Sequence, residues 1–389
     1  MKGTPVGSES RRRAARAAVG SAVAAVTMAA SAQAEAKDLE VTTTRAQGDG
    51  SFIGAVRKAE RDGDRDTITF AKNLRGTIKL KGNLTFDEPV AIAGRGYGNR
   101  RGDSFRRVTL QGPKRGTDLD LDGYERKAVP NVLRELHLRR VSVGSSGPPL
   151  TIKDSYMDGE STVTGSAGVV GQFVYGSRDE AIRVLDTTIT GFAQGIDLYK
   201  SGARVDRSRI SGNLGSGIIG GSYTGVDVVS STISGNGGVG ASVVYESGGD
   251  VINSTVTGNE AGGTYGLDVR NSTVAANEGP GVVGYHYDDD SELSNSIVWG
   301  NAGVDCGPDV ESLGGNLIGT PGDCATLPAD LVGENPRLGK LAANGGPTRT
   351  MAIGKGSPAI GLAVKAEATK FDQRGVKRGK HPDSGAFER

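Results

Sequence analysis

The hydrophobic residues in the middle of this chain recur at regular steps. Six segments each place one Ile or Val among small polar residues, and successive segments are 21, 23, 23, 18 and 24 residues apart. A second aliphatic column stands five residues before the first, and a third column follows a glycine. The first column is Ile189, Ile210, Ile233, Val256, Val274 and Val298, the second is Val184, Val205, Val228, Val251, Val269 and Leu293, and the third is Ile196, Ile218, Ala241, Leu267 and Val282. Such a period predicts a solenoid with three short strands in each repeat.

A repeat of this length cannot bury its own aliphatic residues, so the repeats must stack. Stacking at about 4.8 Å brings each Val or Ile against its counterparts and lets backbone amides pair between coils. We therefore predict an all-β protein, a right-handed parallel β-helix with about 22 residues per coil. A leucine-rich repeat is the rival solenoid, but its L-x-x-L-x-L signature is missing, and a propeller would need hairpin turns that are also missing.

Polar residues mark two corners of each coil. A polar or charged residue precedes the first-column segment in every repeat, where the five-residue offset between columns requires a bend. An Asn follows the segment in five repeats, and we expect these side chains to bond one another in a ladder. The bend residues are Asp186, Arg207, Ser230, Asn253, Asn271 and Asn295, and the ladder residues are Asn213, Asn236, Asn259, Asn277 and Asn301.

Strand-like alternation extends the predicted β-helix over residues 67–301, although we interpret the polar stretch 112–126 as a loop or coil insertion. Residues 35–66 are expected to form an N-terminal cap. Within this cap, residues 51–60 predict an amphipathic helix with Phe52, Val56 and Ala59 on one face. Residues 302–389 are expected to form an irregular C-terminal cap, because the apolar ends of a solenoid need covers.

The first 34 residues have the features of an export signal. Arg11, Arg12, Arg13 and Arg16 precede an apolar stretch over residues 17–30, and residues 32–34 offer a small-residue cleavage site. Both the general secretory route and the twin-arginine route fit, and a surface helix of the mature protein is the alternative. We expect residues 1–34 to be a signal peptide and the mature protein to be secreted or displayed at the cell surface. No later segment is long and apolar enough to span a membrane.

Composition and charge narrow the class of partner. The chain has 62 Gly among 389 residues without a G-x-y period, which excludes collagen. Removing residues 1–34 takes away five of 46 basic residues and one of 45 acidic residues, so that 41 and 44 remain and the mature chain carries about −3. This balance excludes the basic footprint of a nucleic-acid-binding protein. We expect a monomer.

The two cysteines fit an exported protein. Cys306 and Cys324 are the only cysteines in the sequence. A disulfide between them would stabilise the fold by about 3 kcal/mol in the chain-entropy model, and it requires an oxidising compartment. Two free thiols are the alternative. Metal binding is disfavoured because no further Cys or His stands at ligand spacing.

The two ends of the mature chain resemble known segments of bacterial secreted proteins. Residues 50–57, 66–70 and 76–80 resemble the start of secreted parallel β-helix proteins with a CSLREA-type opening. Five motifs in order after residue 312 are similar to a choice-of-anchor Q domain. The segment Ser312–Asn316 comes first, and the five motifs that follow it are Asn335–Gly339, Asn344–Thr348, Gly356–Ile360, Asp372–Gly375 and Asp383–Glu388. Gly361 and Ser384 depart from the residues that such tails often carry. The resemblance implies export and the β-helix fold, and it implies no settled activity.

One segment concentrates candidate chemistry. Asp288, Asp289, Asp290 and Glu292 could bind a hard cation such as Ca²⁺, because carboxylate oxygens are its preferred ligands. Tyr285, His286 and Tyr287 could contact a sugar. The alternative is a solvated loop between two coils. Asp197 and Asp268 occupy similar places after the glycine column, and we expect them to lie too far apart for a catalytic pair.

Two functions remain open. The first is an exported, non-catalytic protein that binds a polysaccharide, cell wall or another cell-surface component along the flat face of its stacked strands. The absence of a recognisable carboxylate constellation favours this function. The second is a lyase or hydrolase for acidic polysaccharides, similar to pectate lyase, which rests on analogy of fold alone. A lyase of this kind would use Ca²⁺ and a basic residue, and a hydrolase would use clustered Asp side chains.

Overall fold

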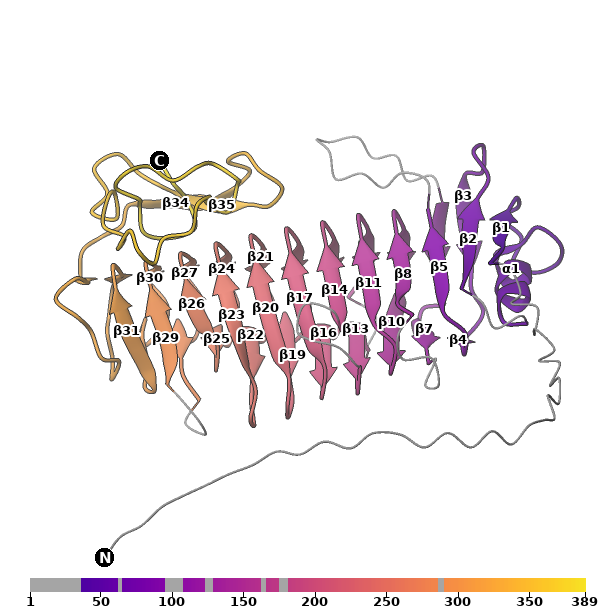
Figure 1. Cartoon of the computed structure of the whole chain (residues 1–389), viewed down its shortest axis with the longest axis horizontal. Coiled ribbons are helices and arrows are strands. Elements are labelled where there is room, and N and C mark those ends of the chain that lie inside the picture. Colours follow the sequence, from indigo (N-terminus) through magenta and orange to yellow (C-terminus); the bar gives the residue numbers. More distant parts are fainter. Residues whose placement is uncertain are drawn as a thin grey trace, which may run out of the picture. The chain divides into compact units, whose positions relative to one another are not determined.

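The computed structural model describes residues 36–61, 65–94, 108–122, 129–161, 166–174, 181–285 and 290–389. Over these residues the chain winds through three parallel sheets, which we call sheets A, B and C after the order in which each coil passes through them (Figure 1). The expected right-handed parallel β-helix is therefore confirmed. The predicted signal peptide, residues 1–34, lies outside the described residues.

Sheets A and B each have twelve strands and sheet C has nine. Sheet A comprises β1 (Asp38–Val41), β2 (Asp66–Phe70), β5 (Val90–Ala93), β8 (Asn131–Arg134), β11 (Leu150–Lys153), β14 (Ile182–Leu185), β17 (Gly202–Asp206), β20 (Gly225–Val229), β23 (Gly248–Ile252), β26 (Asp268–Arg270), β29 (Ser291–Ser294) and β31 (Val310–Gly314). Sheet B comprises β3 (Gly76–Lys79), β6 (Val108–Gln111), β9 (His137–Arg139), β12 (Tyr156–Asp158), β15 (Thr188–Thr190), β18 (Arg209–Ser211), β21 (Thr232–Ser234), β24 (Thr255–Thr257), β27 (Thr273–Ala275), β30 (Ile297–Trp299), β32 (Leu317–Ile318) and β33 (Leu331–Val332). Sheet C comprises β4 (Leu84–Phe86), β7 (Thr117–Leu121), β10 (Val141–Ser146), β13 (Ala167–Gln172), β16 (Gln194–Tyr199), β19 (Ile218–Gly220), β22 (Val239–Val243), β25 (Gly262–Tyr265) and β28 (Val282–Val283).

Two predicted aliphatic columns stack in register, and the predicted third column contains one wrong residue, Leu267. Ile210 pairs with Ile233 and Ile233 with Val256 in sheet B, and all three side chains are fully buried. The second column stacks in the same way in sheet A. In sheet C, however, Thr264 rather than Leu267 pairs with Ala241. Thr264 stands five residues after Asn259, as Ala241 stands five residues after Asn236, so the short coil has lost its residues between sheets C and A.

The stretch 112–126, interpreted as a loop or coil insertion, contains strand β7. Its residues Thr117, Leu119 and Leu121 are buried, whereas Asp118 and Asp120 point outward, which is the alternation of a half-buried strand. Leu119 and Leu121 pair with Leu84 and Phe86 of the preceding coil. Asp118 and Asp120 therefore lie on the outer face of a regular coil.

The bends between sheets A and B use the left-handed backbone conformation at the predicted polar residues. The φ angles are 47° at Asp186, 47° at Asn253 and 51° at Asn271. Asn and Asp adopt this conformation more readily than other residues that carry a side chain. The next residue in each coil is a Ser or Thr, and its backbone N–H donates to the hydroxyl of its counterpart one coil on, as Ser231 does to Ser254 at 3.1 Å.

The Asn side chains form the expected ladder at the corner between sheets B and C. Asn213 Nδ2 donates to Asn236 Oδ1 and Asn236 Nδ2 donates to Asn259 Oδ1, both at 2.9 Å. The ladder continues through Asn277 to Asn301 and ends on Asp305, whose Oδ1 accepts from Asn301 Nδ2 at 2.7 Å. An Asp suits this last place because a carboxylate only accepts hydrogen bonds, and there is no further Asn for it to donate to.

Helix α1 (Phe52–Ala59) lies against the first coils, with Ser51 as its N-cap. The Ser51 hydroxyl accepts from Gly54 N at 3.0 Å. Phe52, Val56 and Ala59 are buried, as the pattern predicts, and the Phe52 ring stacks on that of Phe70 at 6.1 Å. The parallel strands extend on both sides of residues 67–301, from β1 in front of the helix to β33 near the C-terminal segment.

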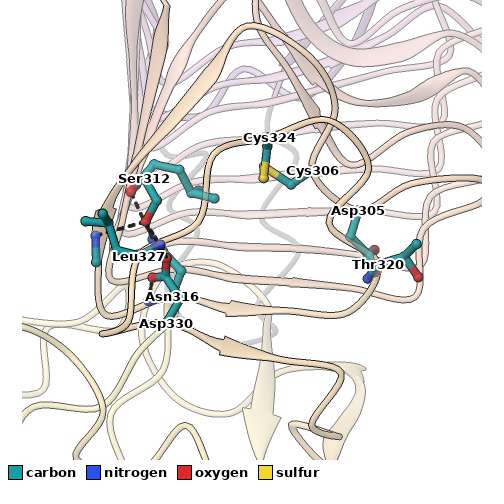
Figure 2. Close-up of a disulfide and its surroundings, with 10 residues drawn as sticks. Asp305, Cys306, Ser312, Asn316, Thr320, Cys324, Leu327 and Asp330 are labelled. Carbon is teal, nitrogen blue, oxygen red and sulfur yellow. Dashed lines mark hydrogen bonds between the residues drawn. A yellow bond between two sulfur atoms is a disulfide. The ribbon is translucent and has the colours of Figure 1, made fainter.

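At the other end, Cys306 and Cys324 form the expected disulfide, with Cα atoms 5.5 Å apart (Figure 2). A polar cluster lies near it. The buried carboxylate of Asp330 accepts from Ser312 Oγ at 2.7 Å, from Leu327 N at 2.8 Å and from Asn316 N at 2.9 Å. Because Asn316 Oδ1 accepts from Ser296 N at 2.9 Å, this cluster also terminates the Ser ladder.

The last part of the chain folds back along the outer face of sheet B, where it contains the antiparallel pair β34 (Leu338–Ala342) and β35 (Thr350–Ile353) (Figure 1). The Gln373 side chain is 1% exposed; it donates to Ser231 O at 3.0 Å and accepts from Thr255 Oγ1 at 2.6 Å. Asn295 Oδ1 accepts from Val364 N at 2.7 Å. This segment therefore covers the side of the solenoid that sheet B forms at these coils.

Candidate functional site

The outer face of sheet C differs in charge from the rest of the solenoid. As far as its strands are described, they contain no Lys or Arg, and their charged residues are Asp118, Asp120 and Asp197. Sheet A mixes both signs: Arg270, for example, contacts Asp250, Asp268 and Glu292 at 3.4, 2.9 and 2.7 Å. Sheet C thus presents an acidic and otherwise uncharged surface.

A groove of about 490 Å³ lies on this face over β7, β10, β13 and β16. Its lining combines carboxylates, hydroxyls and an amide: Asp118, Asp120, Asp122, Ser142, Gly144, Ser145, Ser146, Ser166, Ala167, Val170, Gln172 and Asp197. The groove is open because Gly144 has no side chain; a Cβ there would lie 3.0 Å from Asp120 Oδ1. Hydroxyl and amide groups of this kind can hydrogen-bond to sugar hydroxyls.

The acidic groups in the groove are held in an environment that disfavours their charge. Burial and the neighbouring carboxylates of Asp118 and Asp122 raise the pKa of Asp120 to about 6. Burial and the carboxylate of Asp87 raise the pKa of Asp122 above its ordinary value, and burial alone raises the pKa of Asp197. A ligand that supplies positive charge or hydrogen-bond donors would relieve this cost.

Six aromatic residues follow one another along the edge of sheet C, near the ends of its strands. We call them the aromatic row: Phe173, Tyr199, Tyr223, Tyr245, Tyr265 and Tyr285. Four of them are between 40% and 59% exposed, namely Phe173, Tyr199, Tyr223 and Tyr245. The row is continuous with the groove, because Gln172 lines the groove and pairs with Tyr199 across the sheet.

The rings of the row contact one another. The centroids of Phe173 and Tyr199 are 5.5 Å apart, and Tyr285 lies 5.9 Å from Tyr245 and 5.6 Å from Tyr265. The Lys200 ammonium lies 5.5–5.7 Å from the ring centroids of Phe173, Tyr199 and Tyr223. The rings therefore pack in two groups, one around Lys200 and one around Tyr285, and the row is partly open to solvent.

Three residues of the row have a backbone conformation that is costly for an aromatic residue. The φ angles are 53° at Phe173, 56° at Tyr223 and 59° at Tyr245. This left-handed region is rare for bulky residues, and each such position costs about 1–3 kcal/mol. The bends between sheets A and B meet the same requirement with residues that include Asp and Asn. Aromatic rings at the strained corners therefore point to a role outside folding.

The segment predicted to bind a metal and a sugar is only partly described. Tyr285 belongs to the aromatic row, and its contact with a sugar stays a prediction. His286, Tyr287, Asp288 and Asp289 lie outside the described residues.

The remaining two members, Asp290 and Glu292, do not lie together in a metal site. Asp290 is exposed, and the Glu292 carboxylate pairs with Arg270 at 2.7 Å. Within the described ranges, no three His, Cys, Asp or Glu side chains group as metal ligands. A Ca²⁺ ion here would therefore depend on Asp288, Asp289 and Asp290.

The other two candidate carboxylates occupy different sheets. Asp197 lies in β16 of sheet C and Asp268 in β26 of sheet A, so their similar spacing after a glycine in the sequence is misleading. Asp197 belongs to the groove, whereas Asp268 pairs with Arg270 at 2.9 Å. Among the described residues, no helix is long and apolar enough to cross a lipid bilayer.

Two patterns in the sequence, which the analysis of aliphatic columns does not detect, indicate the groove and the aromatic row. Residues 118–122 alternate Asp with Leu, which is the pattern of a strand with an acidic outer face. The six aromatic residues are 26, 24, 22, 20 and 20 residues apart, close to the length of a coil. A search for polar and aromatic columns, as well as aliphatic ones, would have found both features.

Comparison with known proteins supports the fold. The model of a family described as right handed beta helix region matches residues 170–318. Curated protein sequences give no match. The structure is similar to that of pectate lyase Pel9A, with 14% identity, a TM-score of 0.55 and coverage of 92% of this chain and 98% of that one. It is also similar to the A-module of mannuronan C-5 epimerase AlgE4 from Azotobacter vinelandii, with 11% identity, a TM-score of 0.46 and coverage of 76% and 97%. The chain thus has the right-handed parallel β-helix fold that it shares with Pel9A.

Proposed function

We propose that this protein binds an extended polysaccharide along the outer face of sheet C. The observation that carries the proposal is the aromatic row, whose exposed rings repeat from coil to coil and continue the groove. Because the strands are stacked about 4.8 Å apart, the seven strand steps from β7 to β28 span about 34 Å. A surface of this length with regularly repeated contacts suits a polymer better than a small molecule.

The chemistry of the face also suits a sugar chain. Aromatic rings offer flat apolar surfaces on which the C–H faces of sugar rings can pack. Ser142, Ser146 and Gln172 offer donors and acceptors to sugar hydroxyls in the groove. Asp120 and Asp197 are three strand steps apart, about 14 Å, which exceeds the carboxyl separation of about 5–9.5 Å in the usual glycosidase pairs. Asp118 and Asp120 in β7 and Asp122 directly after it follow one another about 7 Å apart, so these three carboxylates are the ones that a hydrolytic activity would use.

The test is affinity electrophoresis in gels containing soluble polysaccharides, followed by calorimetric titration of those that retard the protein. Replacing one exposed ring, Tyr223→Ala, is expected to weaken binding about fivefold, in line with about 1 kcal/mol for an aromatic contact. The matched control is Phe371→Ala in the C-terminal segment. Phe371 is 43% exposed and carries Lys370 at 5.3 Å from its ring, as the row carries Lys200.

The two outcomes are distinct. Unchanged binding in Phe371→Ala together with weakened binding in Tyr223→Ala supports the proposal. Equal affinities of the two variants and the unmodified protein, or failure of every polysaccharide to bind, would refute it. Circular dichroism of both variants checks that the fold is retained.

A second candidate is hydrolysis of a polysaccharide, which the pKa of Asp120 favours. A carboxyl group with a pKa of about 6 can act as a general acid near neutral pH. Incubation with the bound polymer and measurement of new reducing ends tests this candidate. Turnover that disappears in Asp120→Asn would establish catalysis, whereas stable polymer length would leave binding as the function.

We further propose that the protein is exported and acts outside the cell. The signal-like residues 1–34, the disulfide between Cys306 and Cys324, and the resemblance of both chain ends to secreted proteins support this localisation. Mass spectrometry of the protein from culture medium tests it. An N-terminus at or near Glu35 is expected, and an intact Met1 inside the cell would contradict it.

A further inference from the structure

We infer that the polysaccharide bound along sheet C carries positive charge, as a polymer of deacetylated amino sugars does. This inference rests on the proposed function, and it names the class of ligand for the same face. It is carried by the coincidence of an acidic groove with a row of aromatic rings that already hold an ammonium group.

The first observation is the sign of the charge over the groove. Asp118 and Asp120 project from β7, Asp122 follows directly, and Asp197 projects from β16. Next to Asp122 lies Asp87, whose backbone N–H donates to Glu60 Oε2 at 2.9 Å. In the described part of the chain, basic residues stand at the rim of this face, before β4, β7 and β10 and after β16: Lys81, Lys114, Arg115, Arg140 and Lys200. Arg140 pairs with Glu160 at 2.6 Å.

This arrangement disfavours a polymer of uronic acids. A sugar carboxylate entering the groove would meet Asp118, Asp120 and Asp122 in a partly buried space, where like charges repel strongly. An ammonium group has the opposite effect, because it pairs with the carboxylates and donates up to three hydrogen bonds. The carboxylates would neither attract nor repel a neutral sugar by charge.

The second observation is that the aromatic row already binds an ammonium group of the protein itself. Lys200 Nζ lies within 5.7 Å of three ring centroids, a distance typical of cation–π contacts. Tyr245, further along the row, is 56% exposed, so part of its side chain faces the solvent. The rings around Lys200 therefore accept an ammonium group, as the carboxylates of the groove do, and a ligand ammonium at these three rings would take the place of Lys200, because two cations on the same rings repel each other.

The test compares three hexasaccharides by calorimetric titration in low-salt buffer near pH 6.5. They are hexaglucosamine, its fully N-acetylated form and hexagalacturonate, the last with Ca²⁺ and separately with a chelator. The first two share one backbone and differ in charge, so their comparison isolates the effect of the ammonium groups. Hexaglucosamine is expected to bind at least about tenfold more tightly than the N-acetylated form, the effect of one charge-assisted hydrogen bond.

Variants connect the preference to the groove. Asp120→Asn removes one charge at nearly constant shape, and it is expected to weaken binding of hexaglucosamine about tenfold while binding of the N-acetylated form changes less than about twofold. The matched control is Glu311→Gln, an exposed carboxylate in β31 of sheet A. Tyr223→Ala is expected to weaken binding of both hexasaccharides.

The outcomes separate this inference from the proposed function. Equal binding of the two glucosamine forms, or preferred binding of hexagalacturonate with or without Ca²⁺, overturns the inference and leaves the proposed function standing. Hexaglucosamine binding that Asp120→Asn and Glu311→Gln weaken equally also overturns it. Failure of all three ligands to bind overturns the inference, and the polysaccharide panel then decides the proposed function.

Discussion

The Asn ladder predicts that one central amide contributes much more to stability than an exposed one. In Asn236→Ala, the ladder loses a side chain that is fully buried and makes four hydrogen bonds. Asn236 Oδ1 accepts from Asn213 N at 3.1 Å and from Asn213 Nδ2 at 2.9 Å. Its Nδ2 donates to Asn259 Oδ1 at 2.9 Å and to Ile210 O at 3.3 Å.

The magnitude follows from the groups that would be left without partners. Two buried N–H groups of Asn213 lose their acceptor, and each unsatisfied group costs about 1–3 kcal/mol. Asn259 Oδ1 keeps one partner, because the backbone N–H of residue 236 still donates to it at 3.1 Å. We therefore expect Asn236→Ala to lower the free energy of unfolding by about 3 kcal/mol. Asn213→Ala should cost about half as much, because it deprives one N–H group, that of Phe192, of its acceptor.

The assay is urea unfolding followed by far-ultraviolet circular dichroism and by the fluorescence of Trp299, the single Trp of the chain. Coincident transitions are required before free energies are compared, because long repeat proteins can unfold in stages. Asn73→Ala is the control, since Asn73 lies exposed in the turn between β2 and β3 and should change stability by less than about 0.5 kcal/mol. The reasoning is refuted if Asn236→Ala is as stable as Asn73→Ala.

Three further predictions concern charge, the disulfide and metal. Because the folded pKa of Asp120 is raised from 3.8 to about 6, the folded state disfavours the ionised carboxylate: the penalty is complete above about pH 6 and absent below about pH 4. The full pKa shift corresponds to about 3 kcal/mol, and solvent screening of this half-buried group reduces the penalty to about 1 kcal/mol. Asp120→Asn should therefore raise the free energy of unfolding by about 1 kcal/mol at pH 7.5 and leave it unchanged at pH 4. A gain in stability that persists at pH 4 would contradict this cause. Replacing both Cys306 and Cys324 with Ser should lower the free energy of unfolding by about 2–4 kcal/mol, and reduction of the unmodified protein should lower its stability by the same amount. Calorimetric titration with Ca²⁺ tests the predicted cation site: heat that disappears in the double variant Asp288→Ala/Asp289→Ala would establish it, and no heat in the unmodified protein would exclude it.

The sequence predicts the fold well because every coil needs an aliphatic residue at the same core positions and a polar residue at the same corners. Ile210, Ile233 and Val256 align in the sequence since each fills the same place in the core. Leu267 shows the limit of this logic. Thr264 stands five residues after Asn259, as Ile218 does after Asn213, but a search for aliphatic residues alone passes over a Thr and selects Leu267.

The position of the C-terminal segment could not be read from the repeats. Thr232 and Thr255 contact that segment and are buried, whereas Thr188 in the same column of sheet B is partly exposed. The outer residues of covered and uncovered coils are similar, and the partner, such as Gln373, lies more than 100 residues away in the sequence. Docking of this kind depends on long-range contacts that a local pattern does not encode.

The candidate site was partly predictable. Tyr285 was identified because it stands beside a run of acidic residues, yet its neighbours in space are Tyr245 and Tyr265 from the two preceding coils. The aromatic period was present in the sequence, whereas the groove also depends on Gly144 lying beside Asp120 in the next strand. That second relation requires the register of sheet C, which is known only from the structure.

The most direct test of the central proposal is a crystal structure of the protein with the hexasaccharide that binds most tightly. The proposed function predicts sugar rings packed on Tyr199, Tyr223 and Tyr245, with the chain running across successive strands of sheet C. A hexasaccharide bound on sheet A or on the C-terminal segment, with the aromatic row bare, would contradict it.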